Sequence, residues 1–342
     1  MPLPVAVLGA GSFGTCLAML CGADNDVSLW ARDPEVAEAI NRDHRNPRYL
    51  KEAEIPTSVR ATPDLAEALE GSELVLLTLP STVVREVAER ALPHLEPGSL
   101  LVSAVKGLEF ETGYTMHGVL TDVLPEEHHD RIVCLSGPSF AREIAERKPT
   151  VVTLASREEA YAISVQATLS CPWFRCYSHS DVTGVELGGA LKNVVAIAVG
   201  IGDGMDQGHN SRAAMMTRGL AEIVRLGVHL GAEATTFQGL TGMGDLILTC
   251  TGDLSRNRRV GLALGQGKDL ETILAEMGEV AEGVETTRAA CRLAERLGVE
   301  MPIANSVREV IDGVCTPAEA GERLMRRQLR SERDDDPSAQ TK

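Results

Sequence analysis

"VAVLGAGSFGTCLAMLCGA", residues 5–23, decides the fold that we predict for this chain. A short apolar run is followed by Gly9, Gly11 and Gly14 in the spacing G-x-G-x-x-G, and then by a stretch with helical character. This spacing needs a strand before it and a helix after it, and both are predicted here. The first glycine makes a tight turn, the second lets a diphosphate approach, and the third lets helix and strand pack closely. We therefore expect a dinucleotide-binding turn, with the helix N-terminus stabilising the diphosphate.

Short runs rich in Val and Leu alternate with helical stretches through the first half of the chain. Eight of them are predicted as strands: 4–10, 26–32, 59–62, 73–80, 99–107, 131–139, 150–156 and 173–179. Apolar strands that alternate with helices indicate a parallel sheet covered on both faces. We predict a Rossmann-type domain with a mostly parallel sheet over residues 1–181.

The pattern changes near residue 182, after which only helical periodicity remains. Helices are expected near 182–203, 210–231, 255–266, 269–277, 283–298, 303–312 and 317–328. The second half is therefore predicted as an all-helical domain, 182–328, and the fold class as α/β plus all-α. The tail, 329–342, is charged and poor in apolar residues, so we expect it to be disordered.

The overall charge restricts the partners of this protein. Its 342 residues include 33 Lys and Arg against 49 Asp and Glu, a formal net charge of -16. Nucleic acids and anionic membranes bind basic surfaces, so neither is expected as a partner. We find no signal-peptide pattern and no apolar run that we expect to reach the length of a membrane span. These observations favour a soluble cytoplasmic protein.

The eight cysteines and eight histidines show no spacing typical of a metal site. Most cysteines lie in apolar context and are expected to be reduced core residues. No metal is predicted.

The end of the second predicted strand, "LWARDP", bears on the choice of dinucleotide. An acidic residue there binds the adenosine ribose of NAD, whereas an arginine suits the extra phosphate of NADP. The chain offers both, Arg32 and Asp33, and Arg32 lies closer to the end of the strand. NADP(H) is therefore favoured, and NAD(H) stays open.

One cation, Lys192, interrupts the apolar helix predicted over 182–203. Its neighbours on the same face, three and four residues away, include Gly188 and Gly189 but no carboxylate. We interpret the two glycines as leaving that face bare for a ligand. A lysine desolvated over such a groove has a lowered pKa and can act as a general acid or base. The alternative is a side chain that carries its charge out to water.

A candidate phosphate site lies within 239–261, where a Gly-rich turn with Asp245 precedes a Ser-Arg-Asn-Arg-Arg cluster. Ser255 is a good N-cap, and the backbone N–H groups at a helix start attract anions. Arg256 can bind a phosphate with two hydrogen bonds, and Asn257 adds a neutral donor. The alternative is a capped helix whose arginines are solvated.

Three more candidate residues lie at the ends of predicted strands, at the edge where open parallel sheets bind ligands. Lys106 ends the strand at 99–107, and Gly137 and Ser139 end the next one.

These residues lie in motifs that, jointly and in order over residues 4–325, resemble those of the bacterial NAD(P)-dependent glycerol-3-phosphate dehydrogenases. The motifs are "GAGSFGTCLA", "KGLE", "GPSFAREIA", "ELGGALKNVVAIAVGIGDG", "TFQGLTGMGDLILTCTG", "SRNRRVG" and "VAEGVETTRAA". The resemblance implies a Rossmann domain followed by a helical domain. It also implies reversible reduction of dihydroxyacetone phosphate to sn-glycerol 3-phosphate, a product that feeds phospholipid synthesis.

The resemblance further implies roles for single residues. Lys192 would be the proton donor and acceptor at the reacting oxygen, with Lys106 as a second positive group. The substrate site would be lined by Lys106, Gly137, Ser139, Lys192, Asp245, Ser255, Arg256 and Asn257. The cofactor would touch Ser12, Phe13, Arg32, Lys106, Ala141, Arg256, Val280 and Glu282, beside Gly9, Gly11, Gly14 and Asp33. Phe13 departs from the family, which more usually has Trp there.

Two other functions fit part of the pattern. A dehydrogenase of β-hydroxy acids also combines a Rossmann domain with a helical domain and a helix lysine, but the cluster 255–259 favours a phosphate over a carboxylate. A non-catalytic dinucleotide sensor would explain the glycines and leave Lys192 without a purpose. The apolar helical half is compatible with a homodimer.

Overall fold

The computed structural model describes residues 2–277, 281–329 and 331–332. It divides into two compact units, Met1–Val105 with Met116–Val182, and Lys106–Thr115 with Thr183–Lys342. The division lies one residue from the boundary expected after 181. It differs from that expectation at Lys106–Thr115, which the structure groups with the second unit. Arg296 donates a hydrogen bond of 2.6 Å to the carbonyl of Thr112 and so ties this segment to the helical part.

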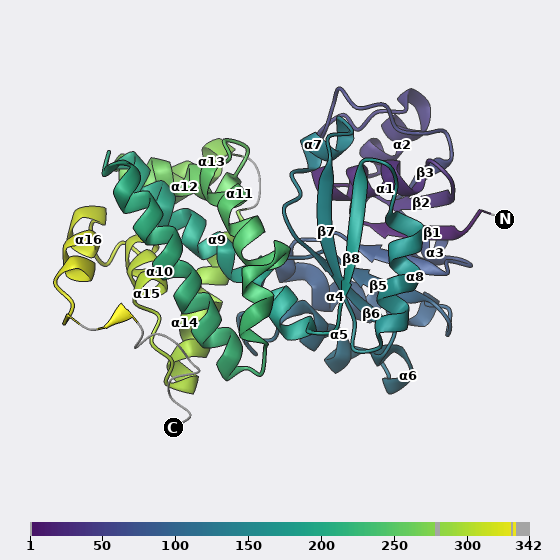
Figure 1. Ribbon diagram of the computed structural model, residues 1–342. Helices are drawn as coiled ribbons and strands as arrows, with labels where there is room; N and C mark the ends of the chain where they lie inside the picture. The colour runs from purple at the N-terminus through teal and green to yellow at the C-terminus, as the bar shows by residue number, and fades with distance from the viewer. Residues whose placement is uncertain (1, 278–280, 330, 333–342) are drawn as a thin grey trace. The chain divides into compact units, whose positions relative to one another are not determined.

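The first unit is built on one eight-stranded sheet in the order β3-β2-β1-β4-β5-β6-β7-β8 (Figure 1). Its strands are β1 Pro4–Leu8, β2 Asp26–Trp30, β3 Val59–Thr62, β4 Leu74–Leu77, β5 Leu100–Ser103, β6 Ile132–Ser136, β7 Thr150–Ala155 and β8 Phe174–His179. All neighbours pair in parallel except β6 and β7, which are antiparallel. The mostly parallel Rossmann-type sheet is thus confirmed, and each of the eight expected segments contains a strand.

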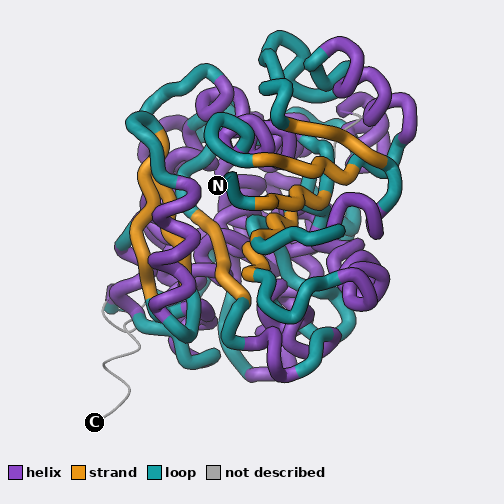
Figure 2. Tube along the Cα trace, turned by 90° about the vertical axis from the view of Figure 1, so that its right-hand side faces the viewer, coloured by secondary structure: helices purple, strands orange, loops and turns teal. Residues whose placement is uncertain are grey.

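Helices cover both faces of this sheet, which explains why its strands are apolar throughout. On β1, Val5 and Val7 pack in one core cluster and Ala6 and Leu8 in another. The first cluster includes residues of α1 Ser12–Cys21, α2 Pro34–Asp43, α7 Ala141–Ala145 and α8 Glu159–Leu169. The second includes residues of α3 Leu65–Leu69, α4 Val84–Ala91 and α5 Met116–Val123. Figure 2 shows the strands turning progressively across the sheet, the twist that L-residues impose. The short helical elements η1 Ser81–Val83, η2 Leu92–His94 and α6 Glu126–His129 complete the unit.

The second unit is helical, as expected (Figure 1). Its elements are α9 Val182–Gly204, α10 Gly208–His229, η3 Ala234–Gln238, η4 Leu240–Gly244, α11 Asp245–Thr251, α12 Arg256–Gly265, α13 Leu270–Met277, α14 Glu282–Leu297, α15 Pro302–Ile311 and α16 Pro317–Met325. The segment 239–251 is more helical than expected, since a π-helical turn (η4) and α11 follow each other where the sequence predicts a Gly-rich turn before the cluster at 255–259.

Helix α9 is the core of the second unit. By length and composition it could cross a membrane, so the expectation that no run reaches that length is wrong. Its most apolar window is entirely buried inside the structure, and a core helix meets the same criterion. Leu187, Ala190 and Leu191 on this helix have no exposed surface.

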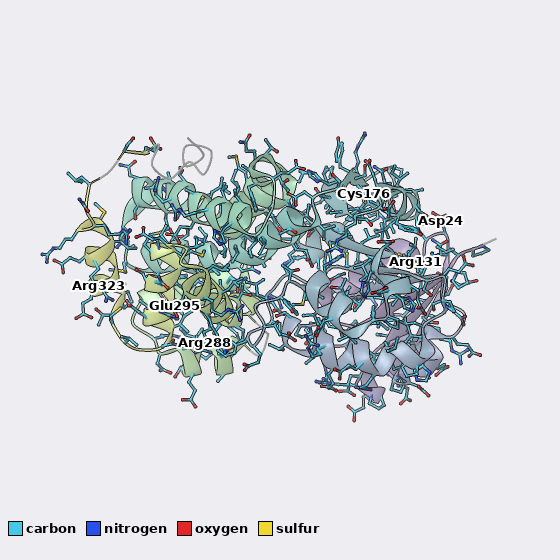
Figure 3. All side chains as sticks on the ribbon, turned by 90° about the horizontal axis from the view of Figure 1, so that it is seen from below. Asp24, Arg131, Cys176, Arg288, Glu295 and Arg323 are labelled. Atoms are coloured by element: carbon cyan, nitrogen blue, oxygen red, sulfur yellow. The ribbon has the colours of Figure 1, made fainter. Side chains whose placement is uncertain are left out.

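Ion pairs at the surface join the last three helices, and Figure 3 labels three of the residues involved, Arg288, Glu295 and Arg323. Arg288 of α14 lies 3.0 Å from Asp312, just after α15, and Glu295 lies 2.6 Å from Arg308 of α15. Arg323 of α16 contacts a glutamate of α15 at 2.6 Å. Exposed pairs of this kind contribute little stability each, so the apolar core must hold these helices together.

All eight cysteines are free thiols, and six of them are buried. Of the tail expected to be disordered, Arg330 and residues 333–342 lie outside the described residues. Leu329, which is described, lies beyond α16 with its side chain exposed.

Candidate functional site

The glycine-rich turn between β1 and α1 has the backbone geometry that its three glycines were expected to provide. Gly9 adopts φ +114°, a conformation that L side chains rarely take. A Cβ on Gly14 would lie 1.8 Å from the carbonyl oxygen of Gly9, so only glycine allows this approach of helix and strand. A Cβ on Gly11 would meet nothing within 4 Å, which leaves its backbone open to a ligand. The strand order reverses between β1 and β4, the point at which such sheets bind nucleotides.

A buried asparagine that the sequence analysis missed supports this turn. Asn46 has no exposed surface, and its Nδ2 donates to the carbonyl of Ala10 at 2.9 Å and to Thr15 Oγ1 at 2.8 Å. Its Oδ1 accepts from the backbone N–H groups of Arg48 and Tyr49 at 3.0 Å each. Asn46 therefore holds the loop after α2 against the glycine-rich turn.

The two candidates at the end of β2 have different surroundings. Asp33 is the N-cap of α2, accepting from the backbone N–H of Glu35 at 3.0 Å, and it is also paired with Arg48. Arg32 is exposed. The carboxylate is thus engaged in local structure, and a second arginine, Arg48, lies beside it.

The remaining candidates of the first unit lie at two helix starts. Ser12 and Phe13 are the first residues of α1, which has no acidic residue in its first turn. Gly137, with φ +134°, directly follows β6, and its carbonyl accepts from Ser139 Oγ at 2.9 Å. Ala141 is the first residue of α7.

In the second unit, one buried carboxylate joins the two candidate lysines. Lys192 Nζ donates to Asp245 Oδ1 at 2.6 Å, and Lys106 Nζ donates to Asp245 Oδ2 at 2.7 Å. Lys192 Nζ also donates to Thr249 Oγ1 at 2.7 Å. Lys192 is 6% exposed, so the alternative of a lysine that reaches out to water is wrong. An ammonium has three N–H donors, and these two partners engage two of them.

Burial lowers the pKa of Lys192 from its ordinary 10.5 to about 8. The negative charge of Asp245 opposes this shift, and the positive charge of Lys106 adds to it. Both protonation states of the amine are therefore accessible near neutral pH. A group that both gives and accepts a proton needs this property.

The neighbours of Lys192 differ from the bare groove that we expected. A Cβ on Gly188 would lie 2.9 Å from the carbonyl oxygen of Thr241, so this glycine admits the π-helical turn η4 rather than a ligand. Gly242 in that turn is equally constrained, because a Cβ there would lie 2.1 Å from the carbonyl oxygen of Phe237. The turn leads directly into Asp245, the first residue of α11. The close packing of α9 against η4 thus places the carboxylate of Asp245 beside Lys192.

The predicted phosphate cluster forms the start of α12. Ser255 is its N-cap and accepts from the backbone N–H of Arg258 at 3.2 Å. Arg256 is exposed at the first helical position. Asn257 is buried, and its Oδ1 accepts from the backbone N–H of Gly283 at 2.9 Å. Its amide nitrogen therefore points away from Gly283 and can donate to another group. Glu282 is the first residue of α14. Val280, also expected near the cofactor, lies outside the described residues.

Glycines bring α9 and α12 into backbone contact. A Cβ on Gly200 would lie 2.2 Å from the carbonyl oxygen of Arg258, and one on Gly261 would lie 2.1 Å from that of Ile197. Gly204 and Gly265 meet the opposite backbone at 2.3 Å in the same way. This contact, here called the glycine crossing (Gly200, Gly204, Gly261 and Gly265), joins the helix that carries Lys192 to the helix that begins at Arg256.

A turn shaped for a diphosphate at the switch point of a doubly wound sheet, followed by a helical unit, places the chain in the class of two-domain dinucleotide-dependent dehydrogenases. Comparison with known proteins is more specific. The N-terminal model of the NAD-dependent glycerol-3-phosphate dehydrogenases matches residues 4–162, and their C-terminal model matches residues 181–322. The chain belongs to this family.

Named relatives agree with this assignment over nearly the whole chain. The glycerol-3-phosphate dehydrogenase (NAD(P)+) of Myxococcus xanthus is 52% identical over 328 residues, covering 96% of this chain and 98% of that protein. Its counterpart from Syntrophotalea carbinolica is 49% identical over 331 residues, covering 96% and 99%. The crystal structure of glycerol-3-phosphate dehydrogenase from Coxiella burnetii superposes with a TM-score of 0.91 at 36% identity, covering 95% of this chain and 99% of that one.

Proposed function

We propose that this protein catalyses the reversible reduction of dihydroxyacetone phosphate to sn-glycerol 3-phosphate with NADP(H) or NAD(H). The observation that carries the proposal is the buried ammonium of Lys192, held by Asp245 and Thr249 within the second unit. Membership of the glycerol-3-phosphate dehydrogenase family supports the choice of substrate.

The residues of the first unit fit a dinucleotide. Gly11 leaves backbone open where a diphosphate would approach, and the N-terminus of α1 offers N–H groups with no acidic side chain in the first turn. When bound, the reduced nicotinamide supplies a hydride to the carbonyl carbon of the substrate. We assign Gly9, Gly11, Ser12, Phe13 and Gly14 to holding the dinucleotide.

Lys192 is the proposed general acid of the reduction. Its ammonium gives one proton to the substrate oxygen as that oxygen becomes an alcohol, and the neutral amine takes the proton back in the oxidation. Asp245 orients the amine through its Oδ1 and stabilises the charged form. Lys106, bonded to Oδ2 of the same carboxylate, adds positive charge that lowers the proton affinity of Lys192.

The start of α12 is the proposed phosphate site. Ser255 places the first turn, whose N–H groups and partial positive charge favour an anion. Arg256 supplies a charged donor and the amide nitrogen of Asn257 a neutral one. We further propose that Gly137 and Ser139 contact the substrate and that Ala141 and Glu282 contact the cofactor, as the family motifs imply.

NADP(H) is the proposed preferred cofactor, with NAD(H) also used. Asp33 already accepts from the start of α2 and pairs with Arg48, which leaves Arg32, just after β2, to meet a 2′-phosphate. An arginine is the residue type that suits this extra phosphate.

Mixing the protein with NADPH and dihydroxyacetone phosphate while recording the absorbance of the reduced cofactor tests the proposal. Lys192→Ala should lower kcat by about 10²–10⁴-fold, the usual contribution of general acid catalysis, with little change in cofactor binding. Arg256→Ala should raise KM for the phosphate substrate. Full activity of the Lys192 variant would refute its assignment, and an unchanged KM would point to another phosphate site.

The same assay distinguishes the rival functions. A β-hydroxyacid dehydrogenase would reduce a β-keto acid and ignore dihydroxyacetone phosphate, and a non-catalytic sensor would bind NADPH without consuming it. The family assignment weighs against both.

We also propose that the protein acts in the cytoplasm as a homodimer and supplies glycerophospholipid synthesis. Eight free thiols are typical of a reducing compartment. Cell fractionation tests the location, and sedimentation of the purified protein tests the assembly. Depletion of the protein followed by lipid analysis tests the metabolic role.

A further inference from the structure

A buried carboxylate in the last turn of α9 holds two arginines from two other helices. Asp203 has a side chain only 7% exposed. Its Oδ1 accepts from Arg212 Nε of α10 at 2.8 Å, and its Oδ2 accepts from Arg258 Nε of α12 at 2.9 Å. Arg258 is itself 16% exposed and also reaches Asp253 at 3.1 Å. The role proposed for Lys192 and the phosphate cluster does not use this group.

Arg258 is the link between Asp203 and the proposed phosphate site. It is the third residue of α12, and its backbone N–H donates to the capping oxygen of Ser255. The same residue therefore carries the cap hydrogen bond on its backbone and the buried ion pair on its side chain. The ion pair therefore ties the first turn of α12, where Arg256 and Asn257 lie, to Asp203 of α9.

The glycine crossing explains why such an anchor is needed. Contact between Gly200, Gly204, Gly261 and Gly265 brings α9 and α12 close, but glycines present no side chains that interdigitate. Helices joined by smooth backbone resist sliding and rotation less than helices whose side chains interlock. The charged hydrogen bond from Arg258 Nε to Asp203 Oδ2, beside the crossing, supplies the missing register.

We propose that Asp203 is a positioning residue for the substrate phosphate. It acts through Arg258 to fix the start of α12, and with it Arg256, at a set place along α9. This inference rests on the proposed function, since it specifies how the phosphate site of that reaction is held. Asp203 touches neither the proton-transfer group nor the dinucleotide turn among the contacts described above.

The effect of Asp203→Asn follows from this geometry. Asn keeps the size and one acceptor oxygen but loses the charge that orients Arg258. The KM for dihydroxyacetone phosphate should rise about tenfold or more, because hydrogen bonds between charged partners depend strongly on distance and angle. The kcat at saturating substrate and the KM for NADPH should each stay within about threefold of the unaltered protein, because Lys192 and the glycine-rich turn are unchanged.

Dihydroxyacetone, the same ketone without the phosphate, separates positioning from a general structural defect. For this substrate, kcat/KM should be equal in Asp203→Asn and in the unaltered protein. A merely structural role would lower kcat/KM for both substrates by the same factor, and that result would overturn the proposal. An unchanged KM for dihydroxyacetone phosphate would overturn it as well.

Matched variants complete the test. Arg212→Gln removes the other partner of Asp203 while keeping the contact to α12, so its KM should stay near that of the unaltered protein. Asp312→Asn breaks an ion pair elsewhere in the second unit, with Arg288, and should change neither KM. If Asp203→Asn does not fold, Asp203→Glu can be used instead, because it keeps the negative charge but moves the carboxylate by one methylene group. It should raise KM for the phosphorylated substrate alone, and an equal loss with both substrates would contradict the proposal.

The proposed function and the role of Asp203 are refuted by different results. If the unaltered protein does not reduce dihydroxyacetone phosphate, the proposed function is wrong. If it does, and Asp203→Asn loses activity equally with and without the phosphate, the function stands and the role of Asp203 falls.

Discussion

Asp245→Asn should change the proton affinity of Lys192 without changing the shape of the site. The two oxygens of Asp245 bond Lys192 Nζ at 2.6 Å and Lys106 Nζ at 2.7 Å. Asn occupies the same volume and keeps one acceptor oxygen, but its negative charge is gone. The interaction that favours the charged form of Lys192 then largely disappears, while the burial that disfavours this form remains.

The size of the shift can be worked from the separation of the charges. At an effective dielectric constant of about 20, two unit charges 2.6 Å apart interact by roughly 6 kcal/mol. Part of the carboxylate charge lies on the more distant oxygen, and the amide dipole restores a little, so roughly 3 to 5 kcal/mol is lost. That corresponds to about two to four pKa units. The pKa of Lys192 should fall from about 8 to about 6 or below.

Profiles of kcat/KM against pH, measured in both directions, read out this shift. Reduction needs the ammonium, so its decline with rising pH should move from about pH 8 to about pH 6 or below in the variant. Oxidation needs the neutral amine, so its rise with pH should move down by the same amount. At pH 7 the reduction activity of the variant should fall at least tenfold. The neutral amine that the oxidation needs should then be the main form of Lys192.

Lys106→Met provides a control of opposite sign. It removes a positive charge that lowers the pKa of Lys192, so both profiles should move to higher pH. Profiles that do not move in Asp245→Asn, or that move in the same direction in both variants, would refute the proposed coupling of these three groups.

Three further predictions concern stability and cofactor choice. Gly261→Ala should lower the free energy of unfolding by about 1–3 kcal/mol or more, because its Cβ would lie 2.1 Å from a carbonyl oxygen. Calorimetry should show this as a lower melting temperature. Gly98→Ala is the control, since a Cβ there meets nothing within 4 Å and the melting temperature should not change. Burial raises the pKa of Glu222 to about 7, above its ordinary 4.5, although the backbone N–H groups of α15 bond it. The native state then binds a proton that the unfolded chain has lost, so stability should fall by about 3 kcal/mol as pH rises from about 4.5 to 7. Urea titrations at several pH values should show this slope in the unaltered protein and its loss in Glu222→Gln. Arg32→Ser should raise KM for NADPH about tenfold while leaving KM for NADH nearly unchanged, and equal effects on both cofactors would exclude a contact to the 2′-phosphate.

Features that depend on neighbours in the chain could be predicted from the sequence. The distinct roles of Gly9, Gly11 and Gly14 follow from their spacing between a strand and a helix, and the backbone shows the expected turn, opening and close approach. The strands could be recognised because burial on both faces makes them apolar without interruption. The change to helices near residue 182 followed from periodicity in the same way.

Features that depend on distant residues could not. Asp245 lies 53 residues from Lys192 in sequence and reaches it only because η4 packs on α9. The positions three and four residues from Lys192 hold no carboxylate, so the sequence around the lysine gives no sign of this partner. The interpretation of Gly188 was wrong for the same reason. A glycine that makes room for the backbone of another segment cannot be distinguished, from the sequence, from one that makes room for a ligand. Asn46 and Asp203 gave no signal, because single polar residues in loops and at helix ends are common.

The glycine crossing has a consequence for attempts to redesign this protein. At its four positions even a methyl group would collide with the opposite backbone, so substitutions at these glycines would force α9 and α12 apart and cannot adjust the span between Lys192 and the start of α12 in small steps. The four glycines are therefore not positions at which the site could be adapted to a phosphorylated ketone with an additional carbon between its carbonyl and its phosphate. Engineering for longer substrates would have to graft a new anion-binding loop and leave the pair of helices intact.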